Sequence, residues 1–326
     1  MQKKMKSAKI KIIYFGTPDI SAHVLEKISQ EEMNIVSVFT RPDSFYGRGK
    51  KLFESPVKQM AKKLNLSVVE PKSLKNNDIV QQIIGLSPDL IIVAAYGLII
   101  PKEILDIPRY GVINIHPSLL PKYQGPSPVA SALLSGDLIT GVSIMLLDEG
   151  MDTGPILATE KLTISTEHNT QTLTEELFQI GSKLLVETIP LWVSGEIIPI
   201  QQNTNDAIIT KLLKKDDGEI HWNFNCEFIA RQIRAFNPWP STFTKFDSKR
   251  LIIEKAFSIT SPHLDSGRKN CPGYVTQTEI NGEIFTGVVC GEGFLVISKV
   301  KLEGSSSQDI VDFIRGKPNF IGATLG

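Results

Sequence analysis

The chain has 326 residues, of which 41% are hydrophobic and 21% charged, and its 35 Lys and Arg balance 35 Asp and Glu. This composition excludes a disordered, collagenous or generally basic nucleic-acid-binding protein, and the length suffices for two domains. The three cysteines lack metal-ligand spacing and no apolar run approaches the roughly 20 residues that span a bilayer. We therefore expect a cytoplasmic protein without a metal site or a membrane partner.

The first half of the chain alternates between apolar strands and helices. An apolar run at 9–16 predicts a buried strand, and Thr17, Pro18 and Asp19 then fit the N-cap, the first helical position and the positive end of the helix dipole. Further strands are expected at 35–40, 67–69, 89–95, 111–116 and 142–147, further helices at 56–64 and 78–86, and a loop at 41–55. This alternation predicts a doubly wound, Rossmann-like α/β domain.

The pattern changes beyond Gly195. Residues 197–209 contain Pro199 and a polar run, which predicts a linker. After a helix at 225–235, short strands are expected at 241–246, 251–257, 273–277, 287–290 and 293–300. Five short strands predict a small barrel or sandwich, of which the oligonucleotide-binding (OB) fold is one example. We expect an α/β domain at 1–195, a linker at 196–212 and an OB-like β-barrel at 213–326.

Charge is unevenly distributed along the sequence. Residues 1–75 carry 15 Lys and Arg against 7 Asp and Glu, a surplus of 8, whereas residues 76–200 carry 5 against 14, a deficit of 9. Such segregation can steer a polyanion toward one part of a molecule. It is equally typical of solvated helix faces, so charge alone leaves both interpretations open.

The segment 111–121 (GVINIHPSLLP) contains the first candidate site. Because strand side chains alternate, Asn114 and His116 share one face of the strand, which Pro117 ends. Open α/β sheets bind ligands at the carboxyl ends of their strands. An amide donor beside an imidazole suits acyl transfer through an oxyanion, and a pair of satisfied polar residues is the alternative.

Asp152 lies in the Gly-bounded segment 148–155, directly after another expected strand. We expect it to reach a strand's carboxyl end as well, so that Asn114, His116 and Asp152 form one site without a metal. The first turn, 16–21, lacks the glycine pattern of a dinucleotide site.

Two further segments are candidates for binding. Residues 96–101 continue an apolar strand into a turn, which lines a pocket for a flat ring or is a simple core turn. Residues 41–51 place Arg48, Lys50 and Lys51 among glycines and aromatic residues, which suits phosphate contacts and base stacking. Solvated surface charge is the alternative for this basic loop.

Several motifs occur together and in order. They are FGTPD (15–19), RPDSFYGRGKKL (41–52), SPVK (55–58), AYGLIIP (95–101), GVINIHPSLLPKYQGPSP (111–128), DEGMDTGPIL (148–157) and AFNPWP (235–240). Over nearly the whole chain this set resembles the methionyl-tRNA formyltransferase family of folate-dependent enzymes. The resemblance implies formyl transfer from 10-formyltetrahydrofolate to the amino group of methionyl initiator tRNA in translation initiation.

The resemblance also implies roles for individual residues. Asn114, His116 and Asp152 match the family's catalytic trio, and Ser118, Leu119, Leu120 and Pro121 match its formyl-folate segment. Tyr96, Gly97 and Asp148 fall where the pteridine pocket is expected, and Arg48, Lys50 and Lys51 match a tRNA-binding loop.

The C-terminal domain would add tRNA contacts, and we expect a monomer. The chain departs from the family pattern at 217–222 (DGEIHW) and at Phe45 and Tyr46. These departures affect the RNA contacts rather than the chemistry.

Two alternative functions remain at this point. A formyltransferase for the amine of a nucleotide sugar shares the catalytic trio, and formylation of aminoacyl-tRNA against a free sugar amine separates the two. An RNA-binding protein built on a degenerate enzyme is the second alternative. The intact trio speaks against it, and loss of folate binding would favour it.

Overall fold

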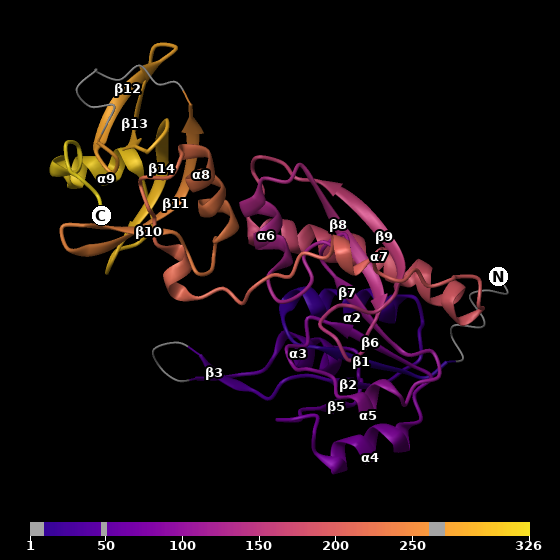
Figure 1. Cartoon of the computed structure of the whole chain (residues 1–326). Coiled ribbons are helices and arrows are strands. Elements are labelled where there is room, and N and C mark those ends of the chain that lie inside the picture. The colour runs from indigo at the N-terminus through magenta and orange to yellow at the C-terminus, as the bar shows by residue number, and fades with distance from the viewer. Residues whose placement is uncertain (1–9, 47–50, 261–270) are drawn as a thin grey trace. The chain divides into compact units, whose positions relative to one another are not determined.

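The computed structural model describes residues 10–46, 51–260 and 271–326. The chain folds into two compact units (Figure 1). The first comprises residues 1–128, 139–163 and 174–210, and the second comprises residues 129–138, 164–173 and 211–326. No helix in the described part of the chain combines the length and the apolar character that a membrane span requires.

The first unit is built on a seven-stranded sheet with the strand order β5-β2-β1-β6-β7-β8-β9. Its strands are β1 (Ile12–Gly16), β2 (Ile35–Phe39), β5 (Val68–Val69), β6 (Leu90–Ala94), β7 (Val112–His116), β8 (Ile139–Leu146) and β9 (Ile156–Thr163). In this sheet order, the strands β5, β2, β1, β6 and β7 pair in parallel, whereas β8 and β9 are antiparallel to their neighbours.

Helices cover both faces of this sheet. They are α2 (Asp19–Gln30), α3 (Pro56–Lys63), α4 (Asn77–Leu86), α5 (Lys102–Leu105) and α7 (Thr170–Val193), the last of which begins in the second unit. Phe15 of β1 packs in a hydrophobic cluster with Ile83 of α4, while Tyr14 on the opposite face donates a hydrogen bond to the Ser21 carbonyl of α2. This alternation confirms the doubly wound α/β prediction.

The start of α2 differs from the prediction. Pro18 is the cap residue and the helix begins at Asp19. The Thr17 hydroxyl donates to the Tyr96 carbonyl at 2.8 Å. The predicted cap at Thr17 is therefore wrong, because its side chain instead joins the turn after β1 to the turn after β6.

The expected loop at 41–55 contains regular structure. Strands β3 (Ser44–Tyr46) and β4 (Lys51–Phe53) form a two-stranded antiparallel sheet in which Ser44 lies opposite Phe53. Figure 1 shows this hairpin projecting away from the main sheet. The prediction of an irregular loop is wrong because apolar residues on both sides of the glycines favour strand pairing.

The second unit contains a mostly antiparallel sheet with the order β10-β11-β14-β13-β12. Its strands are β10 (Phe243–Phe246), β11 (Lys249–Ile259), β12 (Val275–Ile280), β13 (Glu283–Val289) and β14 (Phe294–Leu302), with the short β15 (Gln308–Asp309) beside β14. Each of the five expected strands corresponds to one of β10 to β14. Helices α6 (Pro128–Ser135), α8 (Cys226–Ala235) and α9 (Ile310–Gly316) complete the unit.

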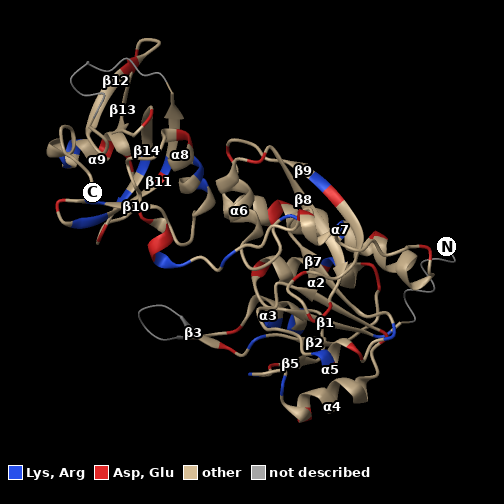
Figure 2. Cartoon of the chain, in the orientation of Figure 1, with Lys and Arg blue, Asp and Glu red and all other residues tan. Residues whose placement is uncertain are grey.

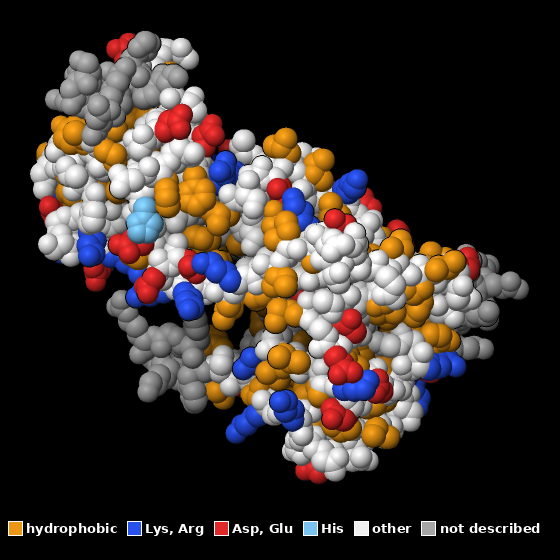
Figure 3. Space-filling model, viewed as in Figure 1, with side chains coloured by type: hydrophobic (Ala, Val, Ile, Leu, Met, Phe, Trp, Pro, Cys, Tyr) orange, Lys and Arg blue, Asp and Glu red, His pale blue; other side chains and the backbone are white. Residues whose placement is uncertain are grey.

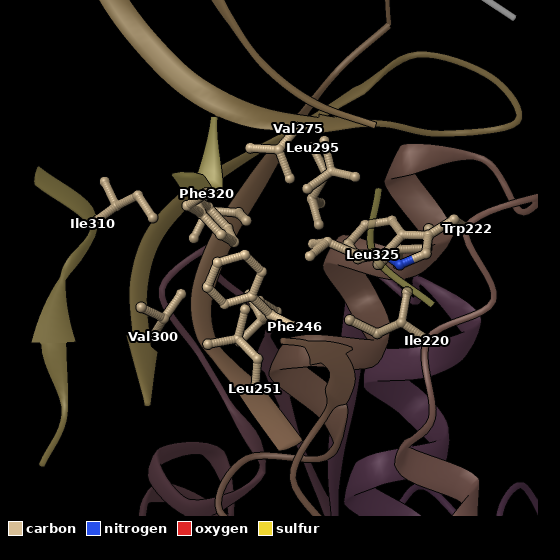
Figure 4. Close-up of a cluster of buried hydrophobic side chains, with 14 of the residues drawn as sticks. Ile220, Trp222, Phe246, Leu251, Val275, Leu295, Val300, Ile310, Phe320 and Leu325 are labelled. Atoms are coloured by element: carbon tan, nitrogen blue, oxygen red, sulfur yellow. The ribbon is translucent and has the colours of Figure 1, made fainter. Parts of the chain in front are cut away.

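The core of the second unit joins distant parts of the sequence (Figure 4). Trp222, which precedes α8, is buried in the same cluster as Phe246 of β10, Phe320 and Leu325. The backbone of residues 322–325 pairs with residues 273–275, at the start of the edge strand β12. The C-terminal residues thus belong to the folded core.

Candidate active site

Strand β7 positions the first two candidate residues. It pairs in parallel with β6 and antiparallel with β8. Ile113 and Ile115 are buried, and Asn114 and His116 alternate with them on the other face of the strand. Two residues along a strand rise about 7 Å, so one substrate group can contact both side chains. The Asn114 amide makes no hydrogen bond within the described residues and is free to bind a ligand.

Two neighbours of the buried His116 ring indicate which of its nitrogens carries the hydrogen in the neutral form. Its Nε2 lies 2.9 Å from the Tyr123 carbonyl oxygen, and a carbonyl only accepts, so Nε2 carries the hydrogen. Nδ1 lies 3.6 Å from Asp152 Oδ2. In the neutral ring, Nδ1 therefore presents a lone pair toward the carboxylate. Two acceptors at this distance can share a proton, or accept together from a donor group that lies beside them.

Asp152 reaches His116 by a different route from the one expected. Because β8 is antiparallel to β7, its last residue, Leu146, lies opposite Ile113, near the amino end of β7. The expectation that Asp152 follows a strand that ends beside His116 is therefore wrong. Asp152 lies in the loop 147–155 between β8 and β9, and this loop places the carboxylate 3.6 Å from the imidazole.

The backbone of Asp152 is in the left-handed region, with φ 58°. Such a conformation in a non-glycine residue persists only where neighbours hold it. The Gly125 amide donates to Asp152 Oδ2 at 2.8 Å, and Gln202 Nε2 donates to the Asp152 carbonyl, also at 2.8 Å. The carboxylate is thus held from the side chain and from the backbone.

The predicted formyl-folate segment, 118–121, forms a turn fastened to β8. The Ser143 hydroxyl donates to the Ser118 carbonyl at 2.7 Å and accepts from the Leu120 amide at 3.1 Å. Leu119 packs against Gly141, where a Cβ atom would come within 2.5 Å of the leucine side chain. Pro121 accepts a hydrogen bond from the backbone amide of Ile208. The turn therefore has a fixed shape.

Tyr96 and Gly97 form the turn after β6. The Tyr96 ring is buried against Phe15, and burial raises the pKa of its hydroxyl, an effect that the nearby Arg41 guanidinium opposes. That hydroxyl has no hydrogen-bond partner among the described residues. Gly97 has φ 84° and its carbonyl accepts from Arg41 Nη1 at 3.2 Å.

Asp148 is exposed, and its carboxylate closes a local turn by accepting from the Gly150 amide and the Thr153 hydroxyl. Leu98 and Leu147, which adjoin Gly97 and Asp148, pack against the same hydrophobic cluster. The structure thus brings the two predicted pteridine-binding turns to one region of the unit.

The predicted tRNA-binding residues are only partly described. Arg48 and Lys50 lie outside the described residues. Lys51 is in β4, where its backbone pairs with Tyr46.

Three residues that the sequence analysis missed support the site. Tyr123 accepts from His116, Gly125 donates to Asp152, and Gln202 holds the Asp152 loop. Tyr123 and Gly125 belong to the motif 111–128, but nothing in the sequence showed which atoms they offer. Gln202 lies in the polar run that predicted a linker.

No group of three or more His, Cys, Asp or Glu side chains is placed to bind a metal ion in residues 10–46, 51–260 and 271–326.

Comparison with known proteins gives consistent results for both units. The formyl transferase family model matches residues 8–189, and the model of the formyl transferase C-terminal domain matches residues 212–318. The methionyl-tRNA formyltransferase of Marinobacter nauticus is 40% identical over 307 residues, which are 94% of this chain and 96% of that protein. The methionyl-tRNA formyltransferase of Pseudoalteromonas translucida is 39% identical over 319 residues, which are 97% of this chain and 98% of that protein.

A solved structure shares the fold at lower identity. The N-formyltransferase from Helicobacter canadensis, in complex with folinic acid and dTDP-3-aminofucose, is 17% identical, with a TM-score of 0.63 over 92% of this chain and 100% of that chain. Both family models, and full-length relatives near 40% identity, agree with the motifs and the geometry of β7 and its loops. The chain belongs to the methionyl-tRNA formyltransferase family.

Proposed function

We propose that the chain transfers the formyl group of 10-formyltetrahydrofolate to the amino group of methionyl initiator tRNA, with Asn114, His116 and Asp152 as the catalytic residues. The observation that carries this proposal is the 3.6 Å approach of Asp152 Oδ2 to His116 Nδ1, beside the unengaged Asn114 amide. Formyl-folate is a co-substrate, and no step requires a metal ion.

The reaction proceeds by direct transfer. The methionyl nitrogen attacks the formyl carbon, a new C–N bond forms, and the bond from that carbon to N10 of the folate breaks. The amine loses a proton and N10 gains one, so no group is left on the enzyme. Asn114 donates to the developing oxyanion, and single donors in other acyl-transfer sites contribute roughly 3 to 4 kcal/mol to transition-state stabilisation.

The hydrogen-bond arrangement supports a specific role for His116 in this proposal. Since Nε2–H is engaged by the Tyr123 carbonyl, the ring donates to an oxyanion only through Nδ1, in its protonated form. The Asp152 carboxylate stabilises that positive charge. Asp152 also accepts the amine proton, directly or through a water held between the two side chains.

Folate contacts are proposed for Ser118, Leu119, Leu120 and Pro121, and for Tyr96, Gly97 and Asp148. Support comes from the fixed shape of the 118–121 turn and from the shared hydrophobic cluster beneath the other two turns. The Helicobacter relative holds folinic acid on the same fold.

The second unit supplies further tRNA contacts in this proposal. A pocket of about 780 Å³ is lined by Arg234, Lys255, Lys299 and Lys301 together with Glu167 and Glu254. Lys255 lies opposite Lys299 at an irregularity in the pairing of β11 and β14, and its Nζ pairs with Glu167 at 3.0 Å; the basic residues of this sheet are blue in Figure 2. Lys299 and Lys301 form no ion pair within the described residues, so their charges are available to an anionic partner.

The OB-like barrel, the boundaries 1–195, 196–212 and 213–326, the monomeric state and the cytoplasmic location stay predictions. Support for an OB-like arrangement is the five-stranded antiparallel path of β10 to β14. Arg48, Lys50 and Lys51 remain the proposed contacts of the hairpin with tRNA.

The direct test is incubation of the protein with 10-formyltetrahydrofolate and methionyl initiator tRNA, followed by detection of formylmethionine after deacylation. A parallel reaction with an amino-sugar nucleotide measures the alternative activity. Formylation of the sugar amine without formylation of the tRNA would overturn the proposal.

The tRNA role of the second unit has its own test. Lys299→Ala combined with Lys301→Ala is expected to weaken tRNA binding by roughly tenfold, because two phosphate contacts are lost. The control is Lys245→Ala, an exposed lysine of β10 outside the pocket. Equal tRNA affinities of the double variant and the control would exclude this pocket.

A further inference from the structure

The polar segment 200–210 is hydrogen-bonded to other parts of the first unit. The Ile200 backbone exchanges hydrogen bonds with Ile156 of β9, each 2.8 Å long. Farther along, the Gln124 amide donates to the Ile208 carbonyl at 2.9 Å, and the Thr210 amide donates to the Gln124 carbonyl at 2.8 Å. The segment 200–210 is therefore hydrogen-bonded to residues 156 and 124 of the first unit.

Gln202 is the residue of this segment that contacts the loop. Its Nε2 donates to two carbonyls, those of Asp152 at 2.8 Å and Gly154 at 2.7 Å. Its Oε1 accepts from Gln124 Nε2 at 2.8 Å. All the hydrogens of one amide nitrogen and its oxygen are thus used, which also fixes the orientation of the amide group.

The same network reaches the Asp152 carboxylate from the other side. Gln124 is buried, and the next residue, Gly125, donates its backbone amide to Asp152 Oδ2. Gly125, next to Gln124, holds the Asp152 side chain, and Gln202 holds the Asp152 backbone. The Gln124–Gln202 hydrogen bond therefore connects these two supports. Asp152 needs both, because its left-handed φ is otherwise unfavourable.

We propose that Gln202 is a positioning residue for catalysis, which sets the distance between the Asp152 carboxylate and His116 through the loop backbone. The inference rests on the proposed role of Asp152. It makes the segment 200–210, the last part of the first unit, a contributor to the active site. Gln202 touches no reacting atom in this scheme and acts only through Asp152.

The expected effect is on turnover. Without the Nε2 donors, two carbonyls of the loop lose their partners and the carboxylate moves away from His116. A misplacement of about 1 Å costs roughly 10²-fold in rate. Substrate binding depends on other residues and is expected to change little.

The experiment compares Gln202→Met and Gln202→Glu with Gln201→Met and Gln201→Glu. Methionine and glutamate keep the length of the side chain and lack the amide donors. Gln201 is an exposed neighbour of the same type, for which no hydrogen bond is formed within the described residues. Both Gln202 variants are expected to lose roughly 10- to 100-fold in kcat while KM values for tRNA and formyl-folate stay within about twofold. The Gln201 variants should keep normal kcat.

Hydrogen exchange of residues 148–155 gives a readout independent of activity. Faster exchange in Gln202→Met than in Gln201→Met, at equal thermal midpoints, is expected if Gln202 holds the loop. Equal exchange and equal kcat in these two variants would overturn the inference. A chain that forms no formylmethionine even unsubstituted would instead overturn the proposed function, and the exchange data would still report on the loop.

A double-mutant cycle keeps the test decisive if Gln202→Met is unstable. Gln124→Met removes the donor to Gln202 Oε1, so the two substitutions should be strongly non-additive in kcat. Additive losses would show that the two glutamines act separately, against the proposal.

Discussion

At the scale of single residues, backbone atoms set the chemistry of the site. The Tyr123 carbonyl determines which nitrogen of His116 carries hydrogen, and the Gly125 amide holds one oxygen of Asp152. The same oxygen, Oδ2, lies 3.6 Å from His116 Nδ1. A substrate donor that approaches beside this pair meets two acceptors at once.

Removal of either member of this pair should abolish the arrangement. His116→Ala and Asp152→Asn are each expected to reduce kcat by roughly 10²-fold or more, because each eliminates a group that contacts the reacting atoms. Affinity for tRNA should be nearly unchanged. Single-turnover formylation and tRNA titration measure the two quantities. Near-normal turnover in either variant would remove that residue from the mechanism.

Gly97 permits a second test at this scale. Gly97→Leu should weaken formyl-folate binding by roughly tenfold or more, since a bulky side chain at this turn obstructs the proposed pocket. Gly195→Leu is a matched control. Both glycines have positive φ, 84° and 77°, and an added Cβ meets only Arg41 side-chain atoms at 3.7 Å or more in the first case and nothing within 4 Å in the second. Equal folate affinities in the two variants, measured by calorimetry, would place the pocket elsewhere.

The sequence predicted that Asn114 and His116 share one face of a strand, as the structure has them, but not how Asp152 reaches them. Their catalytic roles stay predictions. Asn114 and His116 followed from the two-residue period of a strand. Asp152 was predicted for a wrong geometric reason, because nothing in the sequence of 142–147 reveals that the strand is antiparallel. The contribution of Gln202 is a tertiary contact, so a polar run without periodicity could not show it.

At the scale of elements, the hairpin β3–β4 is anchored by a cluster of charges at its base. Lys58 of α3 places Nζ 2.8 Å from both Asp43 and Glu70. The Lys58 ammonium holds the pKa of Asp43 below its ordinary value of 3.8, and the two carboxylates raise the pKa of Lys58. Since the Asp43 pKa is lowered on folding, the pair stabilises the hairpin base above that ordinary value and loses this contribution as pH falls below it.

Loss of this anchor should affect tRNA more than folate. Lys58→Met leaves Asp43 and Glu70 close together without a cation, so the hairpin base should loosen and tRNA affinity should fall by roughly 3- to 10-fold. The control is Lys63→Met, which removes an exposed lysine of the same helix that pairs with Glu26. Filter binding of tRNA measures the effect. A Lys58→Met variant that binds tRNA like its control would separate this cluster from tRNA binding.

Most of the elements with clear periodicity were predicted within a few residues. No prediction was made for α5, α6, β9, α7 or α9. Of these, α7 does carry a helical spacing of buried residues, at Leu173, Leu177, Leu185 and Ile189. β9 is half exposed and reads KLT after Glu160, so its alternation is short. The hairpin β3–β4 was not predicted, because glycines and charged residues have a higher propensity for loops than for strands.

At the scale of the whole molecule, the net charge of zero does not show which acidic and basic side chains form ion pairs. Several lysines of the basic stretch 1–75 are neutralised by acids, as in Lys27–Glu31 and Lys62–Glu54. The visible face in Figure 3 likewise shows basic and acidic side chains interspersed. The acids of these pairs are already subtracted in the surplus of 8, so the surplus is carried by lysines and arginines of the stretch other than these two.

The cations of the segment 48–51 are proposed to dominate the salt dependence of tRNA binding. Arg48→Ala is expected to reduce tRNA affinity and to flatten its dependence on salt by about one counterion, while formyl-folate binding stays unchanged. Lys50→Ala and Lys51→Ala should act in the same direction but less strongly, because lysine lacks the planar fork of arginine. Titrations at several salt concentrations give the slopes. Parallel slopes with equal affinities would show that the loop carries only solvated charge.

The pairing of residues 322–325 with the edge strand β12 has a consequence for biosynthesis. These residues leave the ribosome after every strand of the second unit, so the edge that they cover stays open during translation of that unit. An uncovered edge strand can pair with another nascent chain. The same closure places Phe320 and Leu325 in the core, so the core of the second unit is completed only after residues 320–325 have been synthesised, whereas the last sheet strand of the first unit ends at Thr163. The sheet of the first unit is therefore fully synthesised earlier than the core of the unit proposed to bind tRNA.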